Sequence, residues 1–408
     1  MTGTLVEGRV DARAQRLRDA SLRLSALLVV LGAVDWRRGA YFSGALDPVV
    51  VAKAAVSFGG LVVAYALARS AGRRRLGTLS LWFLGTLLGG STYGALAAGT
   101  LASSGVIVVR VTVLAATVVL LLRAAPALVV LRDLAWACGA LTTVSSLTGL
   151  LEIRGGRLAG GLPAMAPNAL ALLAGIAVAV LAWRTVMGEA SWGITLGATY
   201  FLAVLWMTGS RTALAMLVLG ILLMVVQIRR PRVGLVVGAL VAGAVGVLFA
   251  VGTGALTGFA ERGGDGTSTL DSRFIAWRAA ATLATSAWQT VLGSGLSMKI
   301  IPVTGQYWKD QPLDSSWASL LVQAGLLGLL VAVVWVAWVA RSALRAPYPH
   351  RVLFVGLWVF LVGRSLLESG LFDASPAFLL FLAVSLLAEG ASRERLRDEA
   401  ASTPAPRG

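Results

Sequence analysis

The amino-acid sequence predicts an all-α, polytopic membrane helix bundle, and three observations lead to this class. Of the 408 residues, 57% are apolar and 13% are charged, whereas about a quarter of the residues in a soluble domain are charged. The mean hydropathy is correspondingly high, at +0.82. Apolar runs of about 17–25 residues, the length of a helix that crosses a bilayer, recur along the whole chain. Arginines collect in the short segments between these runs.

About twelve transmembrane helices are expected. Taken in order, the spans are 22–36, 48–68, 78–98, 104–122, 133–151, 167–183, 192–208, 212–228, 233–253, 316–340, 352–370 and 374–389. This divides the chain into an N-terminal tail (1–21), the first nine spans (22–253), a long extracytoplasmic loop (254–315), the last three spans (316–389) and a polar C-terminal tail (390–408). The composition of the last segment predicts disorder.

The distribution of arginine predicts the orientation. With an even number of spans, both termini lie on one side, and that side carries the dense clusters around Arg73 and Arg229. The positive-inside rule makes it the cytoplasm. The net charge of +16 is then explained by arginines that flank helices and face anionic lipid, so no nucleic acid partner is expected.

Three segments fall on the outer side. The first, Leu151 to Gly175, carries Arg157 and Asn168, and the second is the short turn at Arg211. A basic residue in a short outer turn opposes the topology rule, so another interaction should favour Arg211 there. In the third, the long loop, apolar residues from Ser272 to Val291 recur at helical spacing and predict one amphipathic helix on the membrane surface.

Arginines at this depth suit an oxyanion ligand. A guanidinium group binds phosphate oxygens through two parallel hydrogen bonds and keeps its charge at physiological pH. The candidates for such a site are Arg157, Arg211, Arg273 and Arg278. The alternative is that these arginines contact ordinary lipid headgroups or cap helices.

Two charged residues fall within the eleventh span, Arg364 and, four residues later, Glu368. Intramembrane charges face a bundle interior or a cavity, so the two are candidates for the site or for a structural ion pair. Lys53, Arg110 and Asp133 lie near span ends, where snorkelling or a topological role is expected.

Five motifs fall in the second half of the chain and a little before it, at the outer ends of the expected helices. They are Arg157-Leu-Ala-Gly with Pro167-Asn168, Gly209-Ser210-Arg211-Thr212-Ala213, Ser272-Arg273 with Trp277-Arg278, Leu292-Gly293-Ser294-Gly295, and "DSSWASLLVQAGLLG" from Asp314 to Gly328. In this order and placement they resemble the O-antigen ligase and polymerase superfamily of bacterial membrane glycosyltransferases.

The resemblance implies a multi-pass protein of the bacterial cytoplasmic membrane that acts on a glycan linked to polyprenyl (undecaprenyl) pyrophosphate. Such enzymes transfer the glycan to an acceptor hydroxyl on a glycan or a lipid during surface polysaccharide assembly at the cell envelope. By position, Arg157, Arg211, Arg273 and Arg278 would hold the pyrophosphate. No cofactor or metal is implied.

The chain departs from the ligase pattern at Asp314, where ligases commonly carry a histidine that is the proposed base. The one histidine, His350, falls in a cytoplasmic connection, so Asp314 is the candidate catalytic residue. Alternatively, Asp314 caps the tenth span. Other acidic candidates in the loop are Glu261, Asp265, Asp271 and Asp310.

Other readings of the whole chain remain open. A lipid-glycan flippase or other transporter would also bind polyprenyl pyrophosphate, but related halves and a charged cavity at the bilayer midplane would be expected of it. A peptidoglycan-type glycan polymerase would use an acidic residue in an outer loop. The missing histidine favours polymerase over ligase activity.

Overall fold

We describe a computed structural model of the chain, in which residues 3–38, 47–71, 74–153, 156–189, 191–228, 266–303 and 310–402 are described. Within these ranges the fold is all-α except for one short hairpin. The elements are α1 (Gly3–Ala33), α2 (Pro48–Ser70), α3 (Leu79–Ala97), α4 (Leu101–Ala124), α5 (Ala127–Gly149), the 3₁₀ turn η1 (Leu150–Glu152), α6 (Pro167–Val186), α7 (Trp192–Thr208), α8 (Arg211–Val226), α11 (Gly266–Thr282), α12 (Ala287–Leu292), β1 (Ile300–Pro302), β2 (Asp310–Pro312), α13 (Ser316–Leu344), α14 (Tyr348–Ser365), α15 (Pro376–Ala388) and α16 (Gly390–Ser402).

The all-α class is confirmed, and the apolar helices fit a membrane protein. Of the described residues, five helices are long and apolar enough to cross a bilayer, or six if α15 and α16, which are bent by 86°, form one span. Helices α7 and α8 are apolar but shorter. The expected span 233–253 lies outside the described residues. The other expected spans each coincide with a helix, although the span predicted at 352–370 ends earlier, at Ser365.

Proline and capping side chains set many of the helix boundaries. Helices α2, α6, α14 and α15 have proline in the first turn, where its missing N–H removes no helical bond. Asp47 caps α2, and Ser375 caps α15, each by accepting a backbone N–H two or three residues on. These signals explain why apolar runs of similar composition become separate helices.

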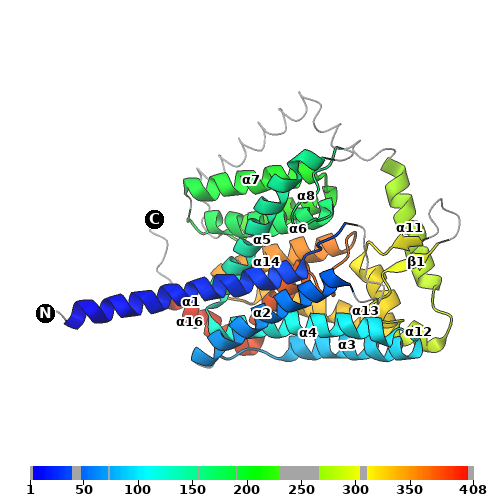
Figure 1. Cartoon of the computed structure of the whole chain (residues 1–408), viewed down its shortest axis with the longest axis horizontal. Helices are drawn as coiled ribbons and strands as arrows, with labels where there is room; N and C mark the ends of the chain where they lie inside the picture. The colour runs from blue at the N-terminus through cyan, green and yellow to red at the C-terminus, as the bar shows by residue number, and fades with distance from the viewer. Residues whose placement is uncertain are drawn as a thin grey trace.

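The connections between the helices gather at two ends of the bundle (Figure 1). We call the end that carries α16 the opposite end, and the end that carries α11 and α12 the site end. At the opposite end, Arg18 and Arg395 donate to the backbone carbonyls of Ala124 and Ala125, and α16 lies beside the start of α5. At the site end lie α11, α12 and the connections α1–α2, α3–α4, α5–α6, α7–α8 and α14–α15. There Thr100 donates to the carbonyl of Ser294, and Arg38 donates to that of Gly160.

Helix α15 forms the centre of the core. Its residues from Pro376 to Ala388 are all buried, and it contacts α3, α4, α5, α6, α13 and α14. Beside α15, the rings of Trp335, Phe372 and Phe381 pack against one another. The Trp335 indole donates a hydrogen bond to the Ser385 hydroxyl. A helix this apolar on every face is expected in a protein core or across a membrane, and here the other helices bury α15.

The outer segment differs from the expectation of one amphipathic helix. Residues 272–291 form two helices, α11 and α12, because Ser286 caps a new helix start by accepting from the N–H of Gln289. After α12, β1 and β2 pair antiparallel, with Ile301 opposite Gln311. A small second core of Ala280, Ile301, Val303, Leu313 and Val322 joins the hairpin to α11 and α13.

Both polar tails contain helix. Residues 390–402, expected to be disordered, form α16, in which Leu396 is fully buried and Arg395 is anchored to α4. Residues 3–21 of the N-terminal segment are continuous with the first expected span, since α1 runs from Gly3 to Ala33. Residues 403–408 lie outside the described residues.

Candidate functional site

Arg157 lies against the turn between α7 and α8. Its Nε donates to the carbonyl of Thr208 at 2.8 Å, so it satisfies a carbonyl at the C-terminus of α7. The next residue, Leu158, donates its N–H to Met207. Gly209 permits this approach because it adopts φ +66°, and a Cβ there would lie 3.4 Å from the Arg157 side chain. The Gly-Ser-Arg-Thr turn thus positions the side chain of Arg157.

Asn168 connects Arg157 to α14. Its side-chain carbonyl accepts from Nη2 of Arg157 at 2.8 Å, and its Nδ2 donates to Oε1 of Glu368 at 2.6 Å. The backbone carbonyl of Asn168 accepts from Nη2 of Arg364 at 3.0 Å. Because Asn168 is in the first turn of α6, directly after Pro167, the Pro-Asn motif fixes the position of the amide between two arginines.

Glu368 is the shared acceptor of the group. It is 8% exposed and makes ion pairs with Arg364 (3.8 Å) and with Arg273 of α11 (3.7 Å). Burial raises the pKa of Glu368, while Arg364 and Arg273 oppose that effect. The expected i, i+4 pair with Arg364 is present, but it lies where α14 ends and not within a span that continues to residue 370.

Asp314 faces Arg273 and does not cap α13. The cap is Ser315, whose hydroxyl accepts from the N–H groups of Trp317 and Ala318, so the capping interpretation of Asp314 is wrong. Oδ2 of Asp314 lies 3.7 Å from Nε of Arg273, and its side chain is 44% exposed. Burial raises the pKa of Asp314 and Arg273 lowers it, with a net upward shift.

Arg211 and Arg278 differ in their relation to this group. Arg211 is exposed at the start of α8, within electrostatic range of Arg157, as Arg273 also is. Arg278 is exposed on α11, and the described contacts do not join it to Asp314 or Glu368. We therefore define the arginine–carboxylate cluster as the seven residues Arg157, Asn168, Arg211, Arg273, Asp314, Arg364 and Glu368.

The chemistry of the arginine–carboxylate cluster suits an anion. Arg273 and Arg364 pair with the two carboxylates, and Asn168 joins Arg157 to Glu368. Arg211 lies within electrostatic range of Arg157. The excess of fixed positive charge provides donors for an oxyanion, and a partly exposed carboxylate beside it can accept a proton. Within the described ranges, no group of three or more His, Cys, Asp or Glu is placed to hold a metal ion.

Two glycine-containing motifs, the Leu-Gly-Ser-Gly segment and the segment around Gly325, hold α12 against α13 beside the site. At Gly325, with φ +66°, helix α13 is broken, and the carbonyls of Val322 and Gln323 accept from the N–H groups of Ser294 and Gly295. A Cβ on Gly325 would lie 2.4 Å from the backbone of Val291. The Gly-Ser-Gly segment after α12 therefore packs into the kink of α13, which fixes α12 beside the helix that follows Asp314.

Other acidic and basic candidates fall elsewhere. His350 is buried at the opposite end, 4.0 Å from Glu399 of α16. Asp310 lies exposed on β2, whereas Glu261, Asp265 and the side chain of Asp271 are outside the described residues. Asp133, in the second turn of α5, pairs with Arg23 of α1 at 3.6 Å.

Lys53 and Arg110 belong to a second charged group, together with Asp35, Lys299 and Asp373. Lys53 is 7% exposed, and Arg110 donates to the carbonyl of Gly32 in α1. The sequence did not predict this second charged group, because its members come from five separate segments. One signal was available: Lys53 and Arg110 are both cations that fall inside predicted spans, near the span ends.

No protein-family model matches the chain, and no curated protein matches it.

Proposed function

We propose that the protein is an outer-leaflet glycosyltransferase of the bacterial cytoplasmic membrane, similar to O-antigen polymerases and ligases. In this proposal about twelve spans place both termini in the cytoplasm and the site end outside. The observation that carries the proposal is the arginine–carboxylate cluster, in which Arg273 and Arg364 pair with two acids and Asn168 joins Arg157 to Glu368.

The proposed reaction uses each part of this cluster. An acceptor hydroxyl attacks the anomeric carbon of the donor glycan, and the bond from that carbon to the pyrophosphate oxygen breaks. Arg211 and Arg273, with Arg157, stabilise the charge that builds on the departing polyprenyl pyrophosphate, without a metal ion. Asp314 accepts the proton of the hydroxyl, and the upward shift of its pKa makes it a better base than an ordinary aspartate.

The position of the charges favours transfer over transport. A flippase would be expected to place them near the middle of the bilayer, where they would meet the substrate from both sides. The arginine–carboxylate cluster instead lies at helix ends: Arg157 contacts the C-terminus of α7, and Arg364 is in the last turn of α14.

The test replaces Arg211 by alanine in the native host and measures polyprenyl-linked glycans by mass spectrometry. We expect transfer to be lost while the protein stays in the membrane, because the leaving group loses a fixed cation. Single repeat units that accumulate on the carrier would identify a polymerase, and long chains would identify a ligase. Arg341 is exposed in the last turn of α13, and Arg341→Ala is the matched control. Full activity of the Arg211 variant would refute the proposed pyrophosphate site.

A further inference from the structure

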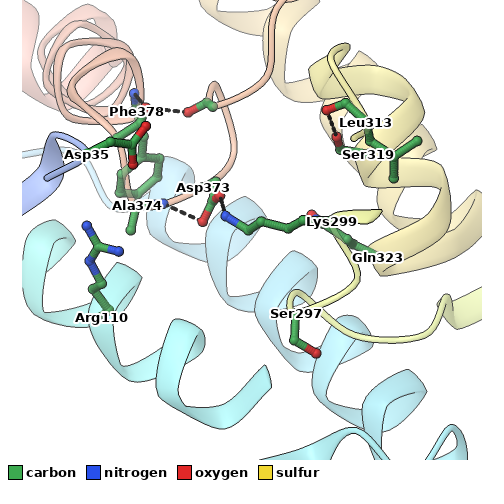
Figure 2. Close-up of polar contacts among 12 residues, drawn as sticks. Asp35, Arg110, Ser297, Lys299, Leu313, Ser319, Gln323, Asp373, Ala374 and Phe378 are labelled. Atoms are coloured by element: carbon green, nitrogen blue, oxygen red, sulfur yellow. Dashed lines mark hydrogen bonds and ion pairs between the residues drawn. The ribbon is translucent and has the colours of Figure 1, made fainter. Parts of the chain in front are cut away.

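A second group of charged side chains lies at the site end, on the side formed by α1, α2 and α4. Its members are Lys53 of α2, Arg110 of α4, Lys299 just before β1, Asp35 just after α1, and Asp373 between α14 and α15. Figure 2 shows Lys299 reaching Asp373 from one side while Arg110 points toward Asp35 and Asp373 from the other. We call these five residues the lysine–arginine cluster.

One pair within this cluster is already satisfied. Nζ of Lys299 makes an ion pair and a hydrogen bond with Oδ2 of Asp373, and the other carboxylate oxygen accepts from the N–H of Ala374. Burial alone would raise the pKa of Asp373, but Lys299, Ala374 and Arg110 bring it below its ordinary value. Asp373 therefore stays ionised and its charge is matched by Lys299.

Two cations remain with incomplete partners among the described residues. Lys53 is only 7% exposed. Its Nζ lies 4.0 Å from Oδ1 of Asp35, which is too long for a hydrogen bond. The Asp35 side chain is 68% exposed, so water screens this pair. Arg110 donates one bond, from Nη2 to the carbonyl of Gly32, and its buried Nε has no partner in the described part of the chain.

The charge of the group is thus unbalanced, since three cations meet two carboxylates. Desolvation disfavours the charge of a largely buried lysine whose ammonium group has no hydrogen-bonded acceptor. Such a group persists where a ligand supplies the missing negative charge. An anion with several oxygens would accept hydrogen bonds from both Lys53 and Arg110 and would balance their charge.

The backbone around Lys299 is held firmly, so the group is organised before any ligand binds. The carbonyl of Lys299 accepts from Leu313, and the preceding carbonyl, of Met298, accepts from the side chain of Gln323 in α13. Ser297 bonds Ser103 and Ser104 in the first turn of α4 at 2.9 Å each. These contacts tie the segment before β1 to two helices.

The depth of the cationic heads matches lipid phosphate. Arg110 lies nine residues into α4, yet its guanidinium reaches Gly32, one residue before α1 ends. Lys53 faces Asp35, just beyond the same helix end. Both heads therefore lie at the level of the helix ends, where the headgroups of a bilayer meet its acyl chains.

This group is separate from the arginine–carboxylate cluster. The charged neighbours of Lys53 are Arg110, Asp35, Lys299 and Asp373, and those of Arg157 are Glu368, Arg211 and Arg273. The two sets share no member among the described residues. We propose that the lysine–arginine cluster is a phosphate-binding site at the site end, which takes the phosphate group of a lipid headgroup. The proposal does not depend on the proposed transferase activity.

The experiment uses the purified full chain in a neutral detergent and counts bound phosphatidylglycerol by native mass spectrometry. We expect Lys53→Met and Arg110→Met each to weaken binding of one lipid at least tenfold, because each removes a cationic donor. Arg341→Ala, at the opposite end, is the control and should bind as the unchanged chain does. Binding kept in both Lys53→Met and Arg110→Met would overturn the assignment.

Two further arms keep the test decisive. Diacylglycerol, which lacks the phosphate, should bind at least tenfold more weakly to the unchanged chain, and equal binding would overturn the proposal without any variant. Inorganic phosphate is added as a competitor: if millimolar phosphate displaces the lipid from this site, the site takes free phosphate and the lipid source is wrong. If Lys53→Met does not fold, Lys53→Arg should retain binding and Lys53→Gln should lose it.

Discussion

At the scale of single residues, Glu368 determines how the arginine–carboxylate cluster holds together. It accepts from Asn168 and pairs with two arginines that come from different helices. The i, i+4 relation of Arg364 to Glu368 could be read from the sequence, because both are charges in an apolar segment. Its contacts with Asn168 and Arg273 could not, since they join residues 200 and 95 positions away through the packing of three helices.

The difference in burial between Glu368 and Asp314 predicts a difference in stability. Glu368→Gln leaves the guanidinium of Arg364, 4% exposed, without its carboxylate, and we expect a loss of about 3 kcal/mol in the free energy of unfolding. Asp314→Asn removes a half-exposed ion pair and should cost less than about 1 kcal/mol. Thermal unfolding of the purified chain in detergent measures both, and equal midpoints for the two variants would contradict this view of Glu368.

At the scale of elements, apolar runs could be read directly, whereas breaks within them could not. Spans such as 48–68 and 192–208 match α2 and α7 closely because lipid-length apolar runs have one stable conformation. The single helix expected over 272–291 was wrong because the spacing of Phe274, Trp277 and Trp288 continues across the cap at Ser286. The kink at Gly325 was equally hidden, since glycine is common inside apolar helices.

The interlock of Gly325 with the chain after α12 gives a prediction at this scale. Gly325→Ala forces a residue with a side chain into φ +66° and places Cβ 2.4 Å from the backbone of Val291. We expect a loss of about 3 kcal/mol or more, from backbone strain and overpacking together. The measurement is again the unfolding midpoint of the full chain.

Gly99→Ala is the matched control for this prediction. Gly99 has a similar φ of +70°, but nothing lies within 4 Å of the position of its Cβ. The control isolates the conformational cost, which should be about 1 kcal/mol. If both variants lost the same free energy of unfolding, the close approach of α12 to α13 would not contribute to the effect of Gly325→Ala.

At the scale of the whole molecule, the connections between helices gather at two ends of the bundle (Figure 1). Arg18, Arg74 and Arg395 lie at the opposite end, where the sequence placed the cytoplasm. The polar segment that forms α16 was missed, because one buried leucine, Leu396, is too weak a signal for a packed helix. The lysine–arginine cluster was missed for a related reason: only the assembled bundle brings its five segments together.

The native cysteine makes the orientation testable. Cys138 is fully buried, so it should not react with a membrane-impermeant maleimide in the folded chain. We expect Arg278→Cys to be labelled in intact spheroplasts, since α11 is at the site end. Arg341→Cys, in the last turn of α13, should be labelled only after the membrane is disrupted. Labelling in the reverse order would invert the proposed topology.

The corner between α15 and α16 has a consequence for how the chain is made. The carboxylate of Glu389 accepts from the N–H groups of Leu79 and Ser80, so it caps α3 from 310 and 309 positions further along the chain. The ribosome therefore synthesises α3 long before it synthesises the residue that caps α3. Until Glu389 has emerged, the first turn of α3 must find other acceptors. The capping of an early helix thus waits for a segment more than 300 positions later in the chain.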